Sequence, residues 1–191
     1  ERDRMNTLVL DGMHLIESHA QAGGQPEEVV VAESGQRKAE IARYLETLPS
    51  GLMATLLADR LFDELSPVQS PSGILALAAQ PAVKEVPNME NDAVLLDGIQ
   101  DPGNVGSILR SAAAAGLRQI LLSEDCAQVW SPKVLRAAMG AHFQLVLHEN
   151  ADLAAFLDGY RGQAVSTLLD GANGTLYALD LSRPPASAFG S

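Results

Sequence analysis

Asn104 and Arg110 are the residues of this chain whose types and spacing most favour chemistry on a substrate. They lie in the stretch LDGIQDPGNVGSILRSAAAAG, residues 96–116, in which an apolar run ends in Asp-Gly and the turn-forming DPGN follows. Apolar residues then recur at helical spacing, so the pattern predicts a strand, a glycine-bearing polar loop and a helix beginning near Gly103. In open α/β folds such a loop lies outside the carboxyl end of a strand, where ligands bind. Arg110 is about two turns into the helix, so its cation and the Asn104 amide can share a pocket.

Other interpretations of this stretch remain open on the spacing alone. Gly103 and Gly106 form G-x-x-G, which is neither the dinucleotide-binding pattern nor a phosphate loop, since no lysine follows. The G-x-x-G of KH modules clamps nucleotide backbones, but the neighbours here are Asp101 and Asn104 rather than basic residues. In the plainest alternative the glycines serve a tight turn, Asn104 caps the helix and Arg110 is a solvated helix residue.

The elements before this stretch predict a compact α/β domain over residues 1–80. Apolar periodicity and turn residues predict strands at 28–32, 52–57 and 73–79, and helices from Met13 to the glycines at 23–24, over 36–48, and from an Asp59 cap to 65. Alternating strands and helices favour a mainly parallel or mixed sheet with helices packed on it. Residues 81–92 hold two prolines and no apolar period, which is typical of a linker.

A second α/β domain is predicted over residues 93–191, in which strand and helix alternate again. After the opening strand, loop and helix, the pattern predicts strands at 119–123, 143–148, 164–169 and 186–189, with helices at 131–138 and 153–160. Such short connections between strands favour a mostly parallel sheet with right-handed crossovers.

Composition limits the classes of partner and site. The chain has 24 acidic and 13 basic residues and a net charge of −11, which predicts weak RNA binding unless basic residues gather locally. No apolar run approaches the roughly 20 residues of a membrane span. The single Cys126 cannot form an internal disulfide and, lying beside Glu124 and Asp125, is expected to be a reduced, unreactive thiol of a cytoplasmic protein. The histidine spacings predict no metal site.

Three long motifs resemble those of a known family. The run DGIQDPGNVGSILRSAAAAGL at 97–117 is similar to the first signature of the TrmH/SpoU family of RNA ribose methyltransferases, in the SPOUT superfamily. SPKVLRAAMGAHFQLVL at 131–147 is similar to a later family segment, and LDGMHLIESHAQAGGQPEEVVVAE at 10–33 resembles the small amino-terminal substrate-binding domain of many members. The resemblance implies a small α/β substrate-binding domain followed by a SPOUT-type (α/β knot) sheet domain. It also implies S-adenosylmethionine as cofactor, tRNA or rRNA as substrate, and a homodimer.

The same resemblance implies roles for particular residues. Arg110 and Asn104 match catalytic positions. Residues 188–191 resemble the first residues of the family's Gly-x-Glu-Gly-x-Gly donor loop, and the later Ser-Leu-Asn signature has no counterpart, so we expect an incomplete and inactive methyltransferase domain. The donor-binding residues expected within the chain are Leu168, Leu169, Gly190 and Ser191.

Two small groups of basic residues are candidates for RNA contact: Arg37, Lys38 and Arg43 in the first domain, and Lys133 and Arg136 in the second. In the alternative, both are ordinary solvated helix faces. A catalytically silent RNA-binding or scaffold protein with the same α/β core is the main competing function. A Rossmann-type nucleotide binder comes third, because both nucleotide-loop patterns are absent from the sequence.

Overall fold

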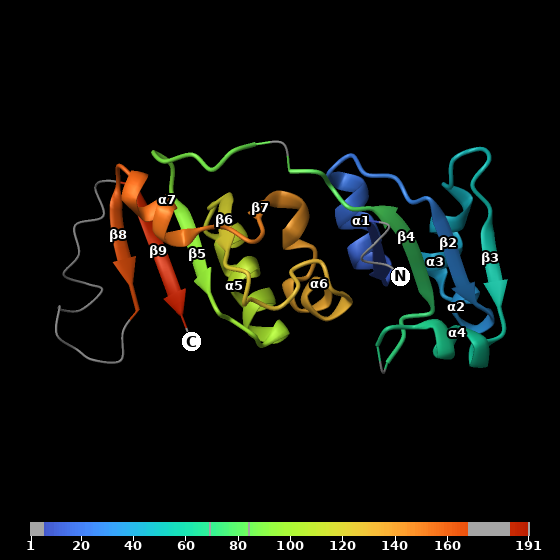
Figure 1. Cartoon of the computed structure of the whole chain (residues 1–191). Coiled ribbons are helices and arrows are strands. Elements are labelled where there is room, and N and C mark those ends of the chain that lie inside the picture. Colours follow the sequence, from blue (N-terminus) through green and yellow to red (C-terminus); the bar gives the residue numbers. More distant parts are fainter. Residues whose placement is uncertain (1–5, 69, 84, 168–183, 191) are drawn as a thin grey trace. The chain divides into compact units, whose positions relative to one another are not determined.

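The computed structural model describes residues 6–68, 70–83, 85–167 and 184–190 and divides into two compact units. The first unit comprises Glu1–Ala82 and Trp130–Phe143, and the second comprises Val83–Val129 and Gln144–Ser191. Each unit is built on one β-sheet with helices packed against it (Figure 1). Within the part of the chain that is described, no helix is long and apolar enough to cross a bilayer.

The sheet of the first unit is mixed and has the strand order β1-β4-β2-β3. Its strands are β1 (Thr7–Asp11), β2 (Glu28–Ala32), β3 (Ala54–Leu57) and β4 (Ile74–Ala79). β4 is antiparallel to both β1 and β2, whereas β2 and β3 run parallel. The predicted strands are present, and the short apolar run of β1 is an addition to the prediction.

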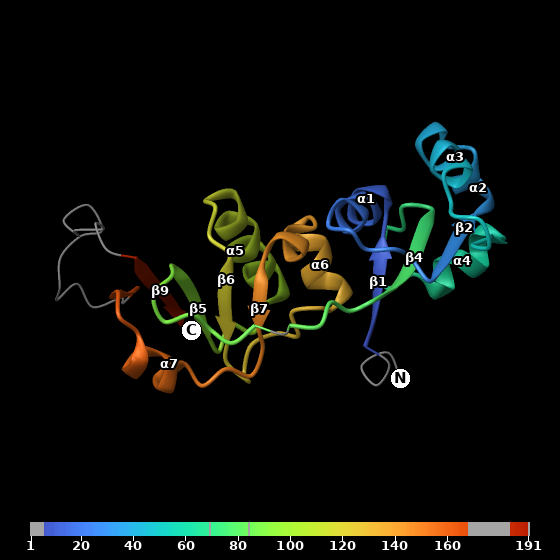
Figure 2. The same cartoon turned by 90° about the horizontal axis from the view of Figure 1, so that it is seen from above.

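Helices cover both faces of this sheet. α1 (Met13–Gln21) and α3 (Ala39–Glu46) contribute to a core with Leu10, Val29 and Val31, while Phe62 of α4 (Asp59–Leu65) packs against the other face (Figure 2). Leucine and valine side chains alternate between the two faces along each strand, as the period of two requires.

The predicted helix over 36–48 is interrupted in the structure. α2 (Glu33–Gln36) and α3 are separated at Lys38, whose backbone is extended with a ψ of 128°. A Cβ on Gly35 would overlap the carbonyl of Gly73, so α2 packs backbone to backbone against the turn before β4. Only glycine permits this approach.

The prediction that Asp59 caps α4 is wrong. The residue before the helix is Ala58, and the Asp59 Oδ1 atom accepts the backbone N–H of Ser34 at 2.8 Å. Hydrogen bonds from Ser34 lower the pKa of the Asp59 carboxyl, and the charge of Arg37 acts in the same direction. The carboxylate therefore ties the start of α4 to α2.

The sheet of the second unit is entirely parallel, with the order β7-β6-β5-β9-β8. The strands are β5 (Ala93–Asp97), β6 (Gln119–Leu122), β7 (Val146–His148), β8 (Gln163–Ser166) and β9 (Pro185–Gly190). The buried apolar runs of β5 and β6 are typical of a parallel sheet covered on both faces. α5 (Pro102–Ala114) and α7 (Leu153–Gly159) lie on opposite faces (Figure 2). The predicted fold class, α/β with a mostly parallel sheet, is confirmed.

The segment Trp130–Phe143 follows β6 in the sequence and packs within the first unit. Leu135 of α6 (Pro132–Ala138) is fully buried in the same core as Leu8 and Leu10, and Trp130 and Phe143 pack around this core. A 3₁₀ turn (Ala141–Gln144) follows α6, so the predicted strand at 143–148 begins later, at Val146. The expected domain boundaries at 80 and 93 assign this segment to the second domain; they remain a prediction.

Candidate functional site

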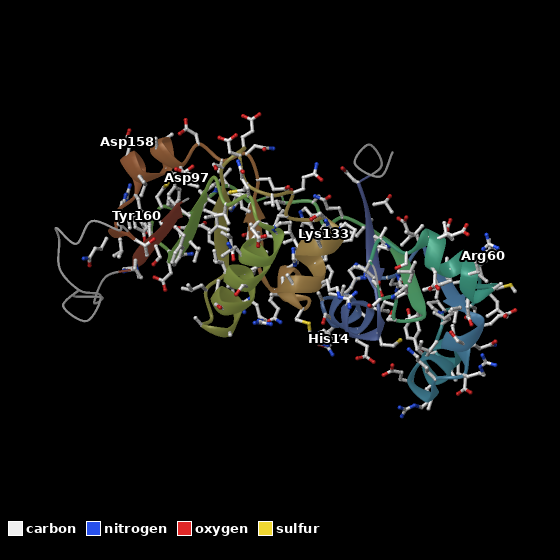
Figure 3. The ribbon with its side chains drawn as sticks, turned by 90° about the horizontal axis from the view of Figure 1, so that it is seen from below. His14, Arg60, Asp97, Lys133, Asp158 and Tyr160 are labelled. Carbon is white, nitrogen blue, oxygen red and sulfur yellow. The ribbon has the colours of Figure 1, made fainter. Side chains whose placement is uncertain are left out.

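The carboxyl ends of β5 and β9 form the edge of the parallel sheet on which the candidate residues lie. Asp97 ends β5 and pairs with Gly190, which ends β9. Both residues are exposed, and Figure 3 marks Asp97 at the end of its strand. Gly98 follows with a φ of 64°, a left-handed conformation that turns the chain away from the sheet.

The loop after β6 braces this turn through its backbone and two small side chains. Gly98 N–H donates to Ser123 Oγ at 3.0 Å, and Ser123 N–H donates to Leu96 O at 2.9 Å. The Cys126 thiol also donates to Leu96 O, at 3.2 Å. These bonds give the half-buried Cys126 a structural role in the loop.

α5 begins with a side-chain cap, and the capping residue is Asp101. Its Oδ1 atom accepts the backbone N–H of Asn104 at 2.8 Å, and Pro102 occupies the first turn. The alternative in which Asn104 caps this helix is therefore wrong. The Asn104 side chain is exposed beside the capped end.

Arg110 is exposed on α5 and forms no ion pair with the carboxylates that the structure describes. Seven residues separate it from Gly103, so the two lie on nearly the same face of the helix. Helical side chains lean towards the amino terminus, which directs Arg110 towards the exposed Gly103. Arg110 therefore supplies a cation on the side of α5 that leads to its amino end, where the Asp101 carboxylate caps the helix.

Of the four predicted donor-binding residues, Gly190 lies in the described part of the chain, while Leu168, Leu169 and Ser191 lie outside it. A Cβ built on Gly190 would have one heavy atom within 4 Å, the carbonyl oxygen of Asp97 at 3.9 Å. Among the residues that the structure describes, nothing else lies within 4 Å of that position. This fits the donor loop that the sequence resemblance implies.

The five predicted RNA-contacting residues are all exposed, but they differ in their contacts. Arg43 Nε donates to Ala39 O of its own helix at 3.2 Å. Lys38 Nζ donates to Ser72 O at 2.6 Å, and Arg136 Nη1 donates to Ser70 O at 3.3 Å. Lys38 and Arg136, which the sequence assigns to separate groups, therefore meet at one loop. Arg37 lies at the end of α2, and Lys133 projects from α6 (Figure 3).

The histidines near α6 have packing roles. The His19 ring lies 5.1 Å from the Phe143 ring in an edge contact, and His142 lies 5.1 Å from Trp130. The ring of His14 contacts Met139 O through Nε2 at 3.1 Å. No group of three or more His, Cys, Asp or Glu residues that could hold a metal ion occurs in the described ranges.

Comparisons with known proteins agree with this architecture. The chain is 30% identical to the 23S rRNA (guanosine(2553)-2′-O)-methyltransferase RlmP of Bacillus subtilis over 166 residues, which are 86% of this chain and 62% of RlmP. The crystal structure of an RNA 2′-O ribose methyltransferase is similar to this chain, with a TM-score of 0.80 and 28% sequence identity. The match covers 99% of this chain and 73% of the chain in that structure. The SpoU methyltransferase AviRb from Streptomyces viridochromogenes has the same fold, with a TM-score of 0.82 at 20% identity over 100% of this chain and 76% of its own.

The profile of the SpoU rRNA Methylase family matches residues 92–191, which contain the strand–loop–helix of Asp97 and Arg110 and the end of β9. The match covers just over half of the chain. The chain therefore belongs to the SpoU rRNA methylase family.

Proposed function

We propose that the protein transfers a methyl group from S-adenosylmethionine to a ribose 2′-hydroxyl of tRNA or rRNA. The observation that carries the proposal is the position of Arg110. This exposed arginine forms no ion pair with the described residues, and it lies on α5, the helix that follows the carboxyl end of β5. Membership of the SpoU family supports the reaction, and the names of RlmP and the matched crystal structure support the 2′-oxygen as acceptor.

Gly190 is proposed to contact the donor at the end of β9, together with Leu168, Leu169 and Ser191. S-adenosylmethionine, when bound, supplies an electrophilic methyl group. The absence of a side chain at Gly190 lets a ligand approach the strand backbone, whose N–H and C=O groups can then serve as hydrogen-bonding partners.

Arg110 is proposed as the catalytic residue that stabilises charge on the substrate. A 2′-hydroxyl becomes negative as it loses its proton and attacks, and a fixed cation lowers the energy of that state. A guanidinium stays protonated at neutral pH, so Arg110 does not act as the base. It instead binds the phosphate next to the ribose, and the proton leaves to water or to a nearby acceptor.

Asn104 is proposed to orient the ribose. Six residues along a helix correspond to about 9 Å of rise and about 120° of rotation, so Asn104 and Arg110 lie on different sides of α5. The Asn104 amide lies beside the capped amino terminus, where it can bond a sugar hydroxyl. This spacing favours contact with the ribose over contact with Arg110.

Further parts of the proposal concern the partners. Arg37, Lys38, Arg43, Lys133 and Arg136 are proposed to contact RNA phosphates, because local cations are needed on a chain of net charge −11. We also propose that the protein acts as a homodimer, which light scattering can test. A cytoplasmic location is proposed from the class of substrate and from the thiol state expected of Cys126.

The test begins with calorimetric titration of S-adenosylhomocysteine into this chain and into the longest product of its gene. Methyl transfer is then measured with tritiated S-adenosylmethionine on tRNA and on rRNA, and resistance of the product to alkaline hydrolysis identifies 2′-O-methylation. We expect Arg110→Ala to lower turnover at least tenfold, about 1.4 kcal/mol in activation free energy, without changing donor affinity. Arg118→Ala, an exposed arginine before the amino end of β6, is the matched control.

Each outcome bears on the assignment. Donor binding by the longer product with methylated RNA supports the reaction, and an active Arg110→Ala protein would remove Arg110 from the catalytic role. RNA binding without donor binding in any form would replace the enzyme with the silent RNA-binding function.

A further inference from the structure

Two cations from distant parts of the sequence lie on one loop of the first unit. Lys38, between α2 and α3, donates to Ser72 O at 2.6 Å, and Arg136, on α6, donates to Ser70 O at 3.3 Å. The two acceptors are two residues apart, so the chain holds them within about 7 Å of each other. The structure thus combines one member from each of the two basic groups seen in the sequence.

The carbonyl groups of Ser70 and Ser72 do not neutralise the charges of Arg136 and Lys38. Each side chain bonds a neutral carbonyl, whereas the ion pairs among the described residues are Arg60–Glu64 and Arg161–Glu90. An ammonium has three N–H donors and a guanidinium has five, so each group retains donors after this single bond. In a chain with 24 acidic and 13 basic residues, two exposed cations held together without a carboxylate partner are an unusual arrangement.

The loop that positions these cations is firmly held. Gly73 O accepts the N–H of Ala32 at 3.0 Å, beside the close approach of Gly35. The amide and hydroxyl of Ser72 both donate to Asp11 Oδ1, at 3.3 and 2.7 Å. These two bonds tie the loop to Asp11, at the end of β1. On the other side, the buried Leu135 anchors the helix that carries Arg136.

We propose that Lys38 and Arg136 form one phosphate-binding site for RNA, with the Ser70–Ser72 carbonyls holding the cations in place before RNA binds. The identification of the ligand as RNA rests on the proposed function. A phosphate oxygen is a charged acceptor and forms stronger bonds to these donors than a neutral carbonyl does. Cations that are already positioned lose less side-chain entropy on binding. Arg43, which bonds its own helix, lies outside the site.

The experiment measures the affinity of the full chain for fluorescein-labelled poly(U) and for a labelled stem–loop RNA over a range of salt concentrations. The variants are Lys38→Gln and Arg136→Gln, with Arg60→Gln as a control that removes the same charge from an exposed, ion-paired position. Each phosphate contact contributes about 0.7 to the slope of log K against log salt for single strands, and about 0.9 for duplexes. We expect Lys38→Gln and Arg136→Gln each to reduce the slope by about that amount, and Arg60→Gln to leave it unchanged.

Two further measurements separate binding from folding and from the reaction. Thermal unfolding checks that the variants fold, and the charge-conserving Lys38→Arg and Arg136→Lys proteins should recover the wild-type slope. Slopes that fall equally in Arg60→Gln, or not at all in the two site variants, overturn the site, as does failure of the wild-type chain to bind either RNA at low salt. Titration with S-adenosylhomocysteine is independent of these cations, so donor binding can support the proposed function even if this site fails.

Discussion

Asp97 at the end of β5 lies directly across from Gly190 at the end of β9, in a parallel register that begins with Ala93 and Ala186. β9 is the last described strand, yet it lies in the sheet between β5 and β8. This order places a residue near the end of the chain beside the turn that leads to α5. The turn at Gly98 and the end of β9 therefore lie at the same carboxyl edge of the parallel sheet.

We expect Gly190→Val to fold normally and to weaken donor binding. Within the described ranges, the nearest atom to a Cβ placed there would be Asp97 O at 3.9 Å, so a side chain fits without a clash. A valine would instead occupy the space that we assign to the donor, so Kd for S-adenosylhomocysteine should rise at least tenfold, about 1.4 kcal/mol. Calorimetry on the longest gene product measures the change.

Ala164→Val is the matched control, because Ala164 is exposed on the neighbouring strand β8. Equal donor affinity in Gly190→Val and the wild type would separate Gly190 from the donor site.

Asp101 and Asn104 should differ in their effect on stability. Asp101→Ala removes the side-chain cap of α5 and should cost about 1 kcal/mol in the free energy of unfolding. Asn104→Ala leaves that bond intact, because the backbone N–H of residue 104 is the donor, and should change stability by less than about 0.5 kcal/mol. Urea denaturation measures both, and a larger loss in Asn104→Ala would contradict the assigned cap.

Leu135→Ala should destabilise the first unit although residue 135 follows the second unit's strand β6 in the sequence. The side chain is fully buried in the core with Leu8 and Leu10, and truncation of a buried leucine costs about 2–5 kcal/mol. Leu157→Ala removes the same atoms from a side chain that is 37% exposed and should cost less. Hydrogen exchange of amides in β1 locates the effect, and unchanged protection there would rule out this packing.

Local patterns predicted much of this molecule, because the interactions behind them are local. The apolar run at 93–96, the DPGN turn and the helical spacing up to Leu109 are set by near neighbours in the sequence, and the structure has the strand, turn and helix in those places. The sequence did not decide which residue caps α5, because Asp101 and Asn104 are both suitable caps by type. The sequence did not predict the interruption of the helix at Lys38, nor the close packing of Gly35 against the distant Gly73.

The features that the sequence did not predict depend on contacts between segments that are distant in the sequence. The five-residue strand β1 contains an apolar run of three, Leu8–Leu10, which is too short for periodicity to decide between strand and helix. Burial of Leu135 in the first unit and the meeting of Lys38 with Arg136 depend on tertiary packing, and the sequence offers no local signal for either. Arg110 was a candidate from its type and spacing and then matched the family motif, whereas Gly190 was named from the resemblance alone. The structure adds the sheet edge at which Gly190 lies.

Stability of the first unit should fall between about pH 7 and pH 5 because of His19. Burial lowers the pKa of the His19 imidazole, so the unfolded chain binds more protons than the folded chain as the pH falls below the ordinary histidine pKa. The ring packs against Phe143, and a charged ring is disfavoured in this position. Burial also lowers the pKa of His148, with Glu85 acting in the opposite direction, so the second unit should lose stability over the same pH range. Asp59, whose pKa is also lowered, acts at more acidic pH.

His19→Gln separates this contribution from the others. Glutamine does not titrate, so the decrease in Tm from about pH 7 to about pH 5 should be smaller in this variant than in the wild type, even if its Tm at neutral pH is lower. His148→Gln should reduce the pH dependence of the second unit in the same way, and the two substitutions should act independently because the residues lie in different units. Calorimetric scans at both pH values measure the difference. If His19→Gln loses as much Tm as the wild type over this range, His19 remains neutral or charged equally in both states and the burial of its ring has no effect on acid stability.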